Sequence, residues 1–148
     1  MMQQTVVIVK PDGMVRDLDK IIKQRIKTIN LSIKHQLKIR FNKADIEFIY
    51  RQHINKPFFN TLVSFMSSTE CSVFIVEGNN AVSRMNEIVG STQPQFAQNG
   101  TIRHEFYQAV PVIPNLEGII QNTIHSSDVT NAEREVKYFN NLRKMLRI

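Results

Sequence analysis

The segment NTIHSSD, residues 122–128, gathers side chains whose types and spacing could do chemistry. It contains one of the four histidines of the chain, His125, followed by two serine hydroxyls and the carboxylate of Asp128. A neutral imidazole has a free lone pair, so His125 could act as a nucleophile. A single histidine at a strand end is more often a structural residue, however, and a catalytic role needs support from elsewhere in the sequence.

The sequence lacks the commonest phosphate-binding, zinc-binding and hydrolytic motifs. Its five glycines form neither a GxGxxG pattern nor a GxxxxGK[ST] loop, and no GxSxG elbow is present. One cysteine and four scattered histidines give no zinc-ligand spacing. A phosphate group would therefore be bound by side chains. Lys10 is one candidate, because the end of an apolar run before the turn Pro11-Asp12-Gly13 is an unusual place for a lysine without a role.

The composition is typical of one soluble globular domain. The length of 148 residues suits a single domain, residues 1–148, with a sizeable core. Apolar residues make up 42% of the chain and charged residues 22%, which argues against disorder. No apolar run approaches the roughly 20 residues of a membrane helix, and no signal peptide is visible. The lone cysteine, Cys71, suits a reducing compartment, so we expect a cytoplasmic protein without a membrane partner.

The positive charge is unevenly distributed. The net charge is +6, and ten of the 19 Lys and Arg residues lie between Lys10 and Lys43, where only three acidic residues occur. Such a surface attracts anions, which include nucleotides, nucleic acids and acidic membranes. An ordinary solvated helix face explains most of these residues equally well.

Hydrophobic periodicity predicts alternating strands and helices. The predicted strands are residues 5–10, 31–41, 71–78 and 123–125. The predicted helices begin at Asp17 or Asp19, at Asn42, at Pro57, at Asn80 and at Ser127 or Asp128, which are residue types suited to helix N-termini. This order predicts an α+β fold of the ferredoxin-like βαββαβ type, a four-stranded antiparallel sheet with helices packed on it. An additional helical pair is expected between the second and third strands.

Seven segments, in order along the chain, resemble the nucleoside diphosphate kinase family. They are VIVKPDG (7–13), PFF and Leu62 (57–62), VEG (76–78), TQP (92–94, usually TNP), GTIR (100–103), NTIHSSD (122–128, usually NxxH(G/A)SD) and AERE (132–135). The resemblance implies a nucleotide-binding, ATP-binding transferase of nucleotide metabolism. In a ping-pong reaction it would transfer the γ-phosphoryl group of a nucleoside triphosphate to a nucleoside diphosphate, through a phosphohistidine intermediate.

The resemblance also implies the catalytic residues and the cofactor. His125 would be the nucleophile, and Glu135, helped by Ser127, would orient its ring by accepting the other N–H. Mg²⁺ would bridge phosphate oxygens and keep most of its waters, so no direct protein ligand is expected. Asp128 would contact the ion through water at most.

The residues that the resemblance assigns to nucleotide binding are Lys10, Tyr50, Phe58, Leu62, Asn86, Thr92, Arg103 and Asn122. The cationic and hydroxyl side chains among them would hold the phosphates, and Asn122 would bind the ribose. Phe58 would stack on the base and Leu62 would line the same slot, which tolerates every base because each has a π-face. Tyr50 would lie near the phosphates.

Several positions depart from the family pattern. Asn86 stands where the family usually has a phosphate-binding arginine, and Arg84 is expected to face away because two residues are about 200° apart around a helix. We therefore expect weakened phosphate binding, unless a residue from elsewhere in the fold or from a partner subunit reaches in. Asp17 replaces a usual glycine, and His104-Glu105 replaces a usual Gly-Asp. The segment 107–121 is longer than usual, and its prolines and glycine suggest an extra loop or hairpin near the site.

Two other functions compete with an active kinase. The first is a catalytically weak nucleotide-binding protein with a regulatory or structural role, supported by Asn86 and Asp17. The second is a nucleic-acid-binding module, suggested by the charge, although the signature of an RNA recognition sheet is absent. The expected partners are nucleoside di- and triphosphates and further copies of the chain, with a hexamer favoured over a tetramer or dimer. No obligatory nucleic acid is expected.

Overall fold

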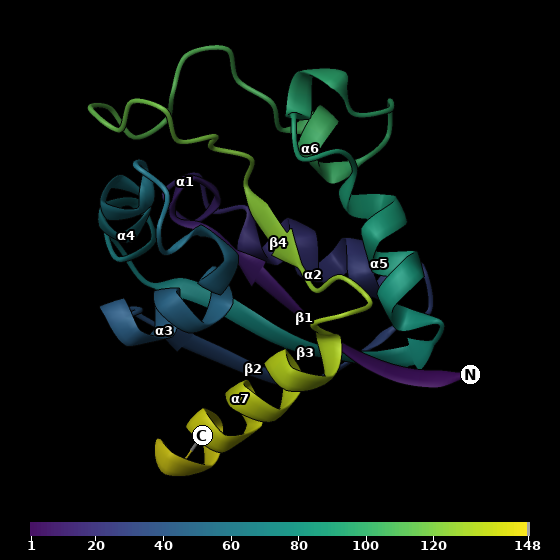
Figure 1. Ribbon diagram of the computed structural model, residues 1–148. Coiled ribbons are helices and arrows are strands. Elements are labelled where there is room, and N and C mark those ends of the chain that lie inside the picture. The colour runs from purple at the N-terminus through teal and green to yellow at the C-terminus, as the bar shows by residue number, and fades with distance from the viewer. Residues whose placement is uncertain (148) are drawn as a thin grey trace.

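The computed structural model describes residues 1–147 and contains one four-stranded sheet (Figure 1). Its strands are β1 (Met2–Val9), β2 (Ser32–Ile39), β3 (Cys71–Asn79) and β4 (Ile124–Ser126). All neighbouring strands are antiparallel, and their order across the sheet is β2-β3-β1-β4. The predicted ferredoxin-like arrangement is confirmed.

Helices connect the strands and cover the sheet. They are α1 (Pro11–Met14), α2 (Asp19–Thr28), α3 (Lys43–Ile49), α4 (Phe59–Met66), α5 (Ala81–Val89), α6 (Ile102–Glu105) and α7 (Ala132–Met145), with short 3₁₀ turns η1 (Arg51–His53) and η2 (Pro94–Phe96). The predicted additional pair between the second and third strands is α3 and α4. Within residues 1–147 no helix combines the length and the apolar character that crossing a membrane would require.

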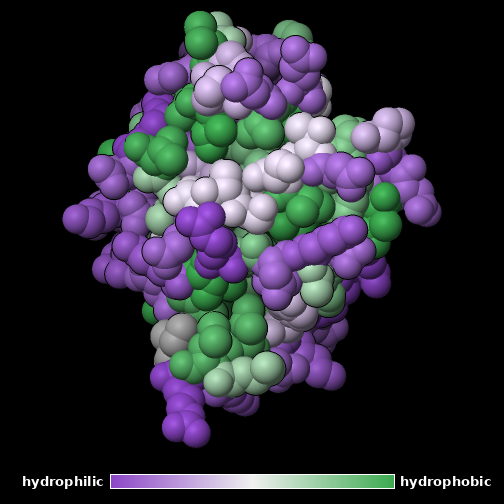
Figure 2. All heavy atoms as spheres, turned by 90° about the vertical axis from the view of Figure 1, so that its left-hand side faces the viewer, coloured by the Kyte–Doolittle hydropathy of each residue, from purple (hydrophilic) through white to green (hydrophobic). Residues whose placement is uncertain are grey.

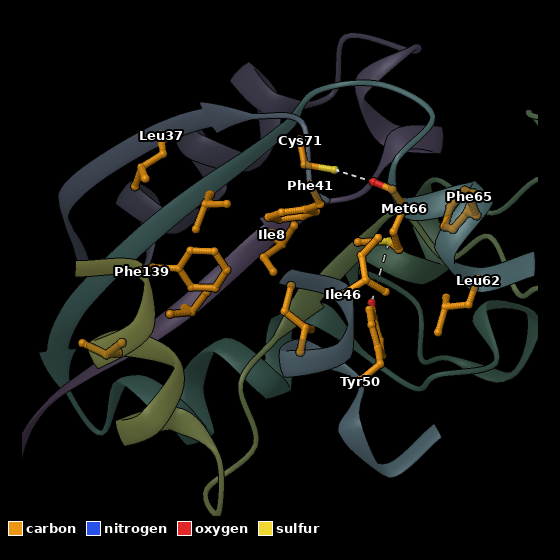
Figure 3. Packing of buried hydrophobic residues seen from close by; sticks show 14 of the residues in the cluster. Ile8, Leu37, Phe41, Ile46, Tyr50, Leu62, Phe65, Met66, Cys71 and Phe139 are labelled. Atoms are coloured by element: carbon orange, nitrogen blue, oxygen red, sulfur yellow. Dashed lines mark hydrogen bonds between the residues drawn. The ribbon is translucent and has the colours of Figure 1, made fainter. Parts of the chain in front are cut away.

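The central strand β1 packs against helices on both of its faces. Because successive side chains of a strand alternate, Val6 and Ile8 enter one hydrophobic cluster while Val7 and Val9 enter another. The first cluster lies between the sheet and α3, α4 and α7, and Figure 3 shows its aromatic and aliphatic side chains interdigitating. The second cluster lies between the sheet and α2, α5 and α6. The sheet is therefore the middle layer of three.

Helix starts were predicted with mixed success. Asn42 begins α3 with a reciprocal capping box to Asp45, as expected. The cap at Asp17 or Asp19 was wrong, since Leu18 precedes α2 without any side-chain cap and Asp17 lies in a left-handed turn at φ 56°. Packing of Leu18 into the core sets the start of this helix instead.

Two further helix starts lie later in the chain than predicted. The helix predicted from Pro57 begins at Phe59. The last helix begins at Ala132, not at Ser127 or Asp128, because the carboxylate of Asp128 accepts the backbone N–H of Asn131 and holds one more turn before the helix. Val129, expected on the buried face, is consequently 79% exposed.

The long segment 107–121 forms an irregular loop, and the alternative of a hairpin was wrong. Its chain is closed by Gln121, whose side chain accepts the N–H of Ile113 at 3.0 Å and donates to its carbonyl at 2.7 Å. Ile113, Leu116 and Ile119 are partly buried against the cluster that contains α4. Figure 2 views the molecule from this side, where apolar patches are separated by hydrophilic residues.

Candidate active site

Strand register brings His125 to the α7 side of the sheet. His125 pairs with Ile8 of β1, and Ile124 pairs with Val9. Ile8 belongs to the cluster under α3, α4 and α7, and paired residues of antiparallel strands share a face. His125 therefore points toward α7, although only three residues form β4.

A buried carboxylate fixes the His125 ring. Its Nε2 lies 3.0 Å from Oε1 of Glu135, and the Ser127 hydroxyl donates to the same oxygen at 2.7 Å. Glu135 is 2% exposed, so its charge is satisfied by these donors and not by water. Since a carboxylate can only accept, Nε2 carries a proton, and the lone pair of the neutral tautomer lies on Nδ1. Ser127 is held in turn by the backbone of Val6.

Lys10 lies at the end of β1 and reaches the same cleft. Its Nζ donates to Oδ1 of Asn122 at 2.8 Å, and the Asn122 amide donates to the Thr92 carbonyl at 2.9 Å. Lys10 is 7% exposed, and burial together with the nearby Arg103 lowers its pKa to about 7. A phosphate placed beside this ammonium would stabilise its charged form.

A strained turn separates Asn122 from the strand that carries His125. Thr123 has φ 77°, and the N–H of Ile124 donates to the Asn122 carbonyl at 2.8 Å, which forms a γ-turn. Such a conformation costs on the order of 1–3 kcal/mol and needs surrounding support. The Asp12 carboxylate accepts the Thr123 N–H at 2.9 Å, and the Lys10 N–H donates to the Thr123 carbonyl at 2.8 Å.

Residues 10–13, which follow β1, therefore support the γ-turn at Thr123. A Cβ atom on Gly13 would lie 2.9 Å from the Val9 side chain and 3.1 Å from the Thr123 carbonyl, so this position accepts only glycine without movement. Asp12 is buried, which raises its carboxyl pKa. The sequence did not reveal that Asp12 and Gly13 support the Thr123 turn, although both residues belong to the VIVKPDG segment.

The central cleft has a volume of about 590 Å³. It is lined by eight of the predicted site residues, Lys10, Tyr50, Asn86, Thr92, Arg103, Asn122, His125 and Glu135. Arg103 donates to the carbonyls of Gly90 and Ile124, which fixes its guanidinium at the cleft wall. Burial lowers the pKa of Arg103 to about 10. The cleft thus combines two rigidly held cations with an anchored imidazole.

A second cavity of about 270 Å³ adjoins the cleft and contains the other two predicted binding residues, Phe58 and Leu62. Gly118, Ile119 and Ile120 of the long loop form part of its wall. Lys10, Thr92 and Asn122 line both cavities, so the polar cleft and the more apolar slot are continuous. A ligand that placed a flat apolar ring in the slot could place polar groups attached to that ring in the cleft.

His53 lies where the two cavities meet and was not among the predicted site residues. Its ring centroid is 5.3 Å from that of Phe58 and 6.2 Å from that of Tyr50. Partial burial and the nearby Lys56 and Lys10 lower its pKa, which favours the neutral ring. In the sequence, helical periodicity after Asn42 indicated only that His53 lies on an inner helix face.

Tyr50 meets the site through its ring. Its hydroxyl points into the core toward the sulfur of Met66, 3.9 Å away (Figure 3). The ring edge lies against His125, with centroids 6.1 Å apart, and the Lys10 ammonium is 5.8 Å from the ring centroid. Burial raises the pKa of the Tyr50 hydroxyl, so it stays protonated. Tyr50 therefore supports the catalytic side chains and gives the cleft an aromatic wall.

Asn86 contacts the protein with both ends of its amide. Its Oδ1 accepts the Ser126 hydroxyl at 2.6 Å, and its Nδ2 donates to the Ser127 carbonyl at 3.1 Å. Arg84 faces away, as predicted, and donates to the carbonyls of Asn79 and Ile29. Among residues 1–147, the cleft is lined by one lysine, Lys10, and one arginine, Arg103.

The described chain, residues 1–147, has no group of three or more His, Cys, Asp or Glu residues placed to hold a metal ion. Asp128 is an exposed carboxylate at the cleft rim, and its Oδ1 accepts from Asn131. A hard cation at this place would take most of its oxygen ligands from a bound anion and from water.

Comparisons with known proteins agree with this geometry. The sequence profile of the family described as Nucleoside diphosphate kinase matches residues 3–145. A nucleoside diphosphate kinase of Helicobacter hepaticus is 35% identical over 145 residues, covering 97% of this chain and 99% of the relative. That of Rhodospirillum centenum is 40% identical over 138 residues, covering 93% and 92%.

Solved structures are similar over the same length. A halophilic nucleoside diphosphate kinase from Halobacterium salinarum in complex with CDP has a TM-score of 0.82 and 32% identity, over 94% of this chain and 88% of that one. A transition-state mimic of the Borrelia burgdorferi enzyme with bound vanadate and ADP has a TM-score of 0.81 and 28% identity, over 92% and 85%.

Proposed function

Since the chain belongs to the nucleoside diphosphate kinase family, we propose that it transfers phosphoryl groups through His125. Membership makes it a nucleotide-binding phosphotransferase. One observation carries the assignment of His125: its Nε2 is held by buried Glu135 while the ring lines a cleft with two cations. A structural histidine would not need an unprotonated nitrogen beside an anion-binding cleft.

The reaction follows from this arrangement in two half-reactions. Nδ1 of His125 attacks the γ-phosphorus of a nucleoside triphosphate, an N–P bond forms, and the bond to the bridging oxygen breaks. The nucleoside diphosphate leaves with that electron pair. The ring then carries positive charge, which Glu135 stabilises through the Nε2 proton. In the second half-reaction a terminal oxygen of another nucleoside diphosphate attacks the phosphorus and restores the neutral ring.

Lys10 and Arg103 hold the phosphates in this proposal. Both are anchored by hydrogen bonds before substrate arrives, so little reorganisation is needed when charge shifts between oxygens. The Thr92 hydroxyl adds a neutral polar group at the cleft wall. Asn122, whose Oδ1 is shared with Lys10, binds the ribose at the junction of cleft and slot.

The adjoining slot holds the nucleobase. Phe58 offers an aromatic face, and Leu62 and Ile119 supply apolar contact. Stacking needs only the π-face of a base, so we propose that purine and pyrimidine diphosphates are all accepted. His53, at the entrance to the slot, contacts the nucleotide between base and phosphates.

Kinases of this family in general need a divalent cation, and we propose Mg²⁺. The lining fits an ion carried by the phosphates, because Asp128 offers one exposed carboxylate at the rim. When bound, the ion neutralises phosphate charge. Asp128 would contact the ion through one of its waters. Activity after chelation should return with Mg²⁺.

Labelling tests the proposal directly. The purified protein, incubated with γ-labelled ATP, should retain an acid-labile, alkali-stable phosphate that GDP removes as GTP. His125→Ala should retain none while remaining folded by circular dichroism. His35→Ala, a histidine of β2 outside both cavities, is the matched control and should label normally. Label that persists in His125→Ala would contradict the assignment.

The alternative of a catalytically weak regulator is not favoured. The residues that a catalytically weak protein would be expected to lack all line one cleft: His125, Glu135, Lys10 and Arg103.

We further propose that residues 1–148 act as one domain, a proposal supported by the family match over residues 3–145. A homo-oligomer, hexameric before tetrameric or dimeric, is proposed from the family resemblance and is measurable by light scattering. A cytoplasmic site of action is supported by the free, buried Cys71.

A further inference from the structure

Two departures from the family pattern touch each other in space. Asn86 stands at the position of a usual arginine, and Ser126 stands where the signature has Gly or Ala. They are 40 residues apart in sequence, yet the Ser126 hydroxyl donates to the Asn86 Oδ1 at 2.6 Å. The Asn86 Nδ2 donates to the next carbonyl, that of Ser127, at 3.1 Å. A glycine or alanine at position 126 could not make the first contact, so each residue gives the other a partner.

These contacts use half of the hydrogen-bonding capacity of the Asn86 amide. Its oxygen accepts from Ser126 and one of its two N–H groups is used by Ser127, which leaves a single N–H for a ligand. The side chain is also shorter than that of the arginine usual at this position. Asn86 is thus poorly placed to be a strong phosphate ligand and well placed to fasten α5 to the end of β4.

The fastened segment is the one that carries the chemistry. Ser126 follows His125 directly, and the Ser127 hydroxyl donates to Glu135, which in turn holds the His125 ring. Asn86 is therefore one residue away from the nucleophile on one side and two hydrogen bonds away from its orienting carboxylate on the other. Ser126 itself is half-buried.

We propose that Asn86 and Ser126 form a clamp, defined by their mutual hydrogen bond, that positions the nucleophile; this proposal rests on the proposed role of His125. Asn86 is then a positioning residue and not a replacement for the phosphate-binding arginine. The clamp is neutral, and phosphate charge is met by Lys10 and Arg103. Its effect should appear in the rate of His125 phosphorylation more than in nucleotide affinity, because positioning changes the geometry of attack.

A double-mutant cycle tests the clamp. Asn86→Ala, Ser126→Ala and the double variant are compared in single-turnover phosphorylation by ATP and in ADP binding by calorimetry. Each single variant should slow phosphorylation by about 3–10-fold, the effect of one or two hydrogen bonds. The double variant should be no slower than the slower single one, since either change breaks the clamp. Dissociation constants for ADP should change by less than about twofold, because the proposal gives Asn86 no phosphate to bind.

Two variants complete the design. Ser126→Thr keeps the hydroxyl and should restore the phosphorylation rate. Ser83→Ala, on the exposed side of the same helix, removes a hydroxyl that bonds only the Asn80 carbonyl and should leave both measurements unchanged. Additive losses in the cycle, or weaker ADP binding with an unchanged rate, would overturn the clamp. Failure of the proposed function looks different, because the unmodified protein would then take no label at all.

Discussion

The two walls of the central cleft differ in how deeply their side chains are buried. One wall, from β1, β4 and α7, presents Lys10, Asn122 and Glu135, which are 7%, 4% and 2% exposed. The other, from α5 and the loop after it, presents Asn86 and Thr92, which are both exposed. Lys10, Asn122 and Glu135 each bond another part of the protein away from solvent, whereas the bonds of Asn86 to Ser126 and Ser127 lie at the solvent-facing edge.

This difference teaches where the sequence can change. Catalysis depends on geometry at the scale of single hydrogen bonds, so the buried wall tolerates little exchange. Phosphate binding sums several contacts and can lose one of the exposed ones. The departure at Asn86 lies on the exposed wall, whereas the residues proposed for chemistry all lie on the buried one. The comparison predicts large effects for the buried wall and small effects for the exposed wall.

The largest effect is expected for Lys10→Met. The variant keeps the length and apolar character of the side chain but removes the ammonium beside the transferred group. Removing one pre-positioned donor of this kind costs about 10²–10³-fold in rate, so kcat/KM should fall by that factor. Steady-state transfer from ATP to GDP measures it. A loss of only a few-fold would remove the distinction between the two walls.

Glu135→Gln should have the next largest effect. The amide keeps the shape of the carboxylate but loses the charge that stabilises the phosphorylated ring. The phosphorylation rate should fall by about 10–100-fold with little change in ADP affinity. Glu133→Gln, an exposed position on the same helix, is the control and should behave like the unmodified protein. Weaker ADP binding at an unchanged rate would make Glu135 a binding residue.

A smaller effect is expected from pH. Burial lowers the pKa of Lys10 to about 7, so its charge in the free site is present below that pH and is lost as pH rises through it. Phosphate favours the charged form, and ADP affinity should therefore fall by up to about tenfold per pH unit above pH 7. Titrations between about pH 7 and 9 avoid the phosphate's own ionisation near pH 6.

Lys10→Arg provides the matching control for the pH experiment. A guanidinium stays charged throughout this range, so its ADP affinity should be nearly constant with pH. A flat profile in the unmodified protein would show that Lys10 remains charged in the empty cleft. The buried wall would then be less dehydrated than its exposed fractions indicate.

The smallest net effect is expected for Asn86→Arg, on the exposed wall. The new cation should tighten ADP binding by roughly 5–10-fold, the low end of a charge-assisted hydrogen bond. The same substitution breaks the contact with Ser126, so His125 phosphorylation should slow and kcat/KM should change little. Calorimetry and single-turnover kinetics separate the two effects. Unchanged affinity would mean that the exposed wall does not meet the phosphates.

The sequence by itself determined the features that depend on local spacing or on a specific motif. Strand alternation and helical periodicity were sufficient for the βαββαβ order, and the capping box at Asn42 is a contact between near neighbours. The outward direction of Arg84 follows from helix geometry alone. Eight of the ten predicted site residues that line the two adjoining cavities belong to the family segments, whose order fixes a known fold.

Tertiary structure decided whatever depends on contacts between distant segments. The pairing of Asn86 with Ser126, the support of the Thr123 turn by Asp12 and the closure of the long loop by Gln121 all require elements to be packed first. The start of α2 was set by burial of Leu18 and not by the nearby aspartates. Side-chain spacing reports one turn or one strand, whereas these contacts depend on how the sheet aligns its strands and where each helix lies upon it.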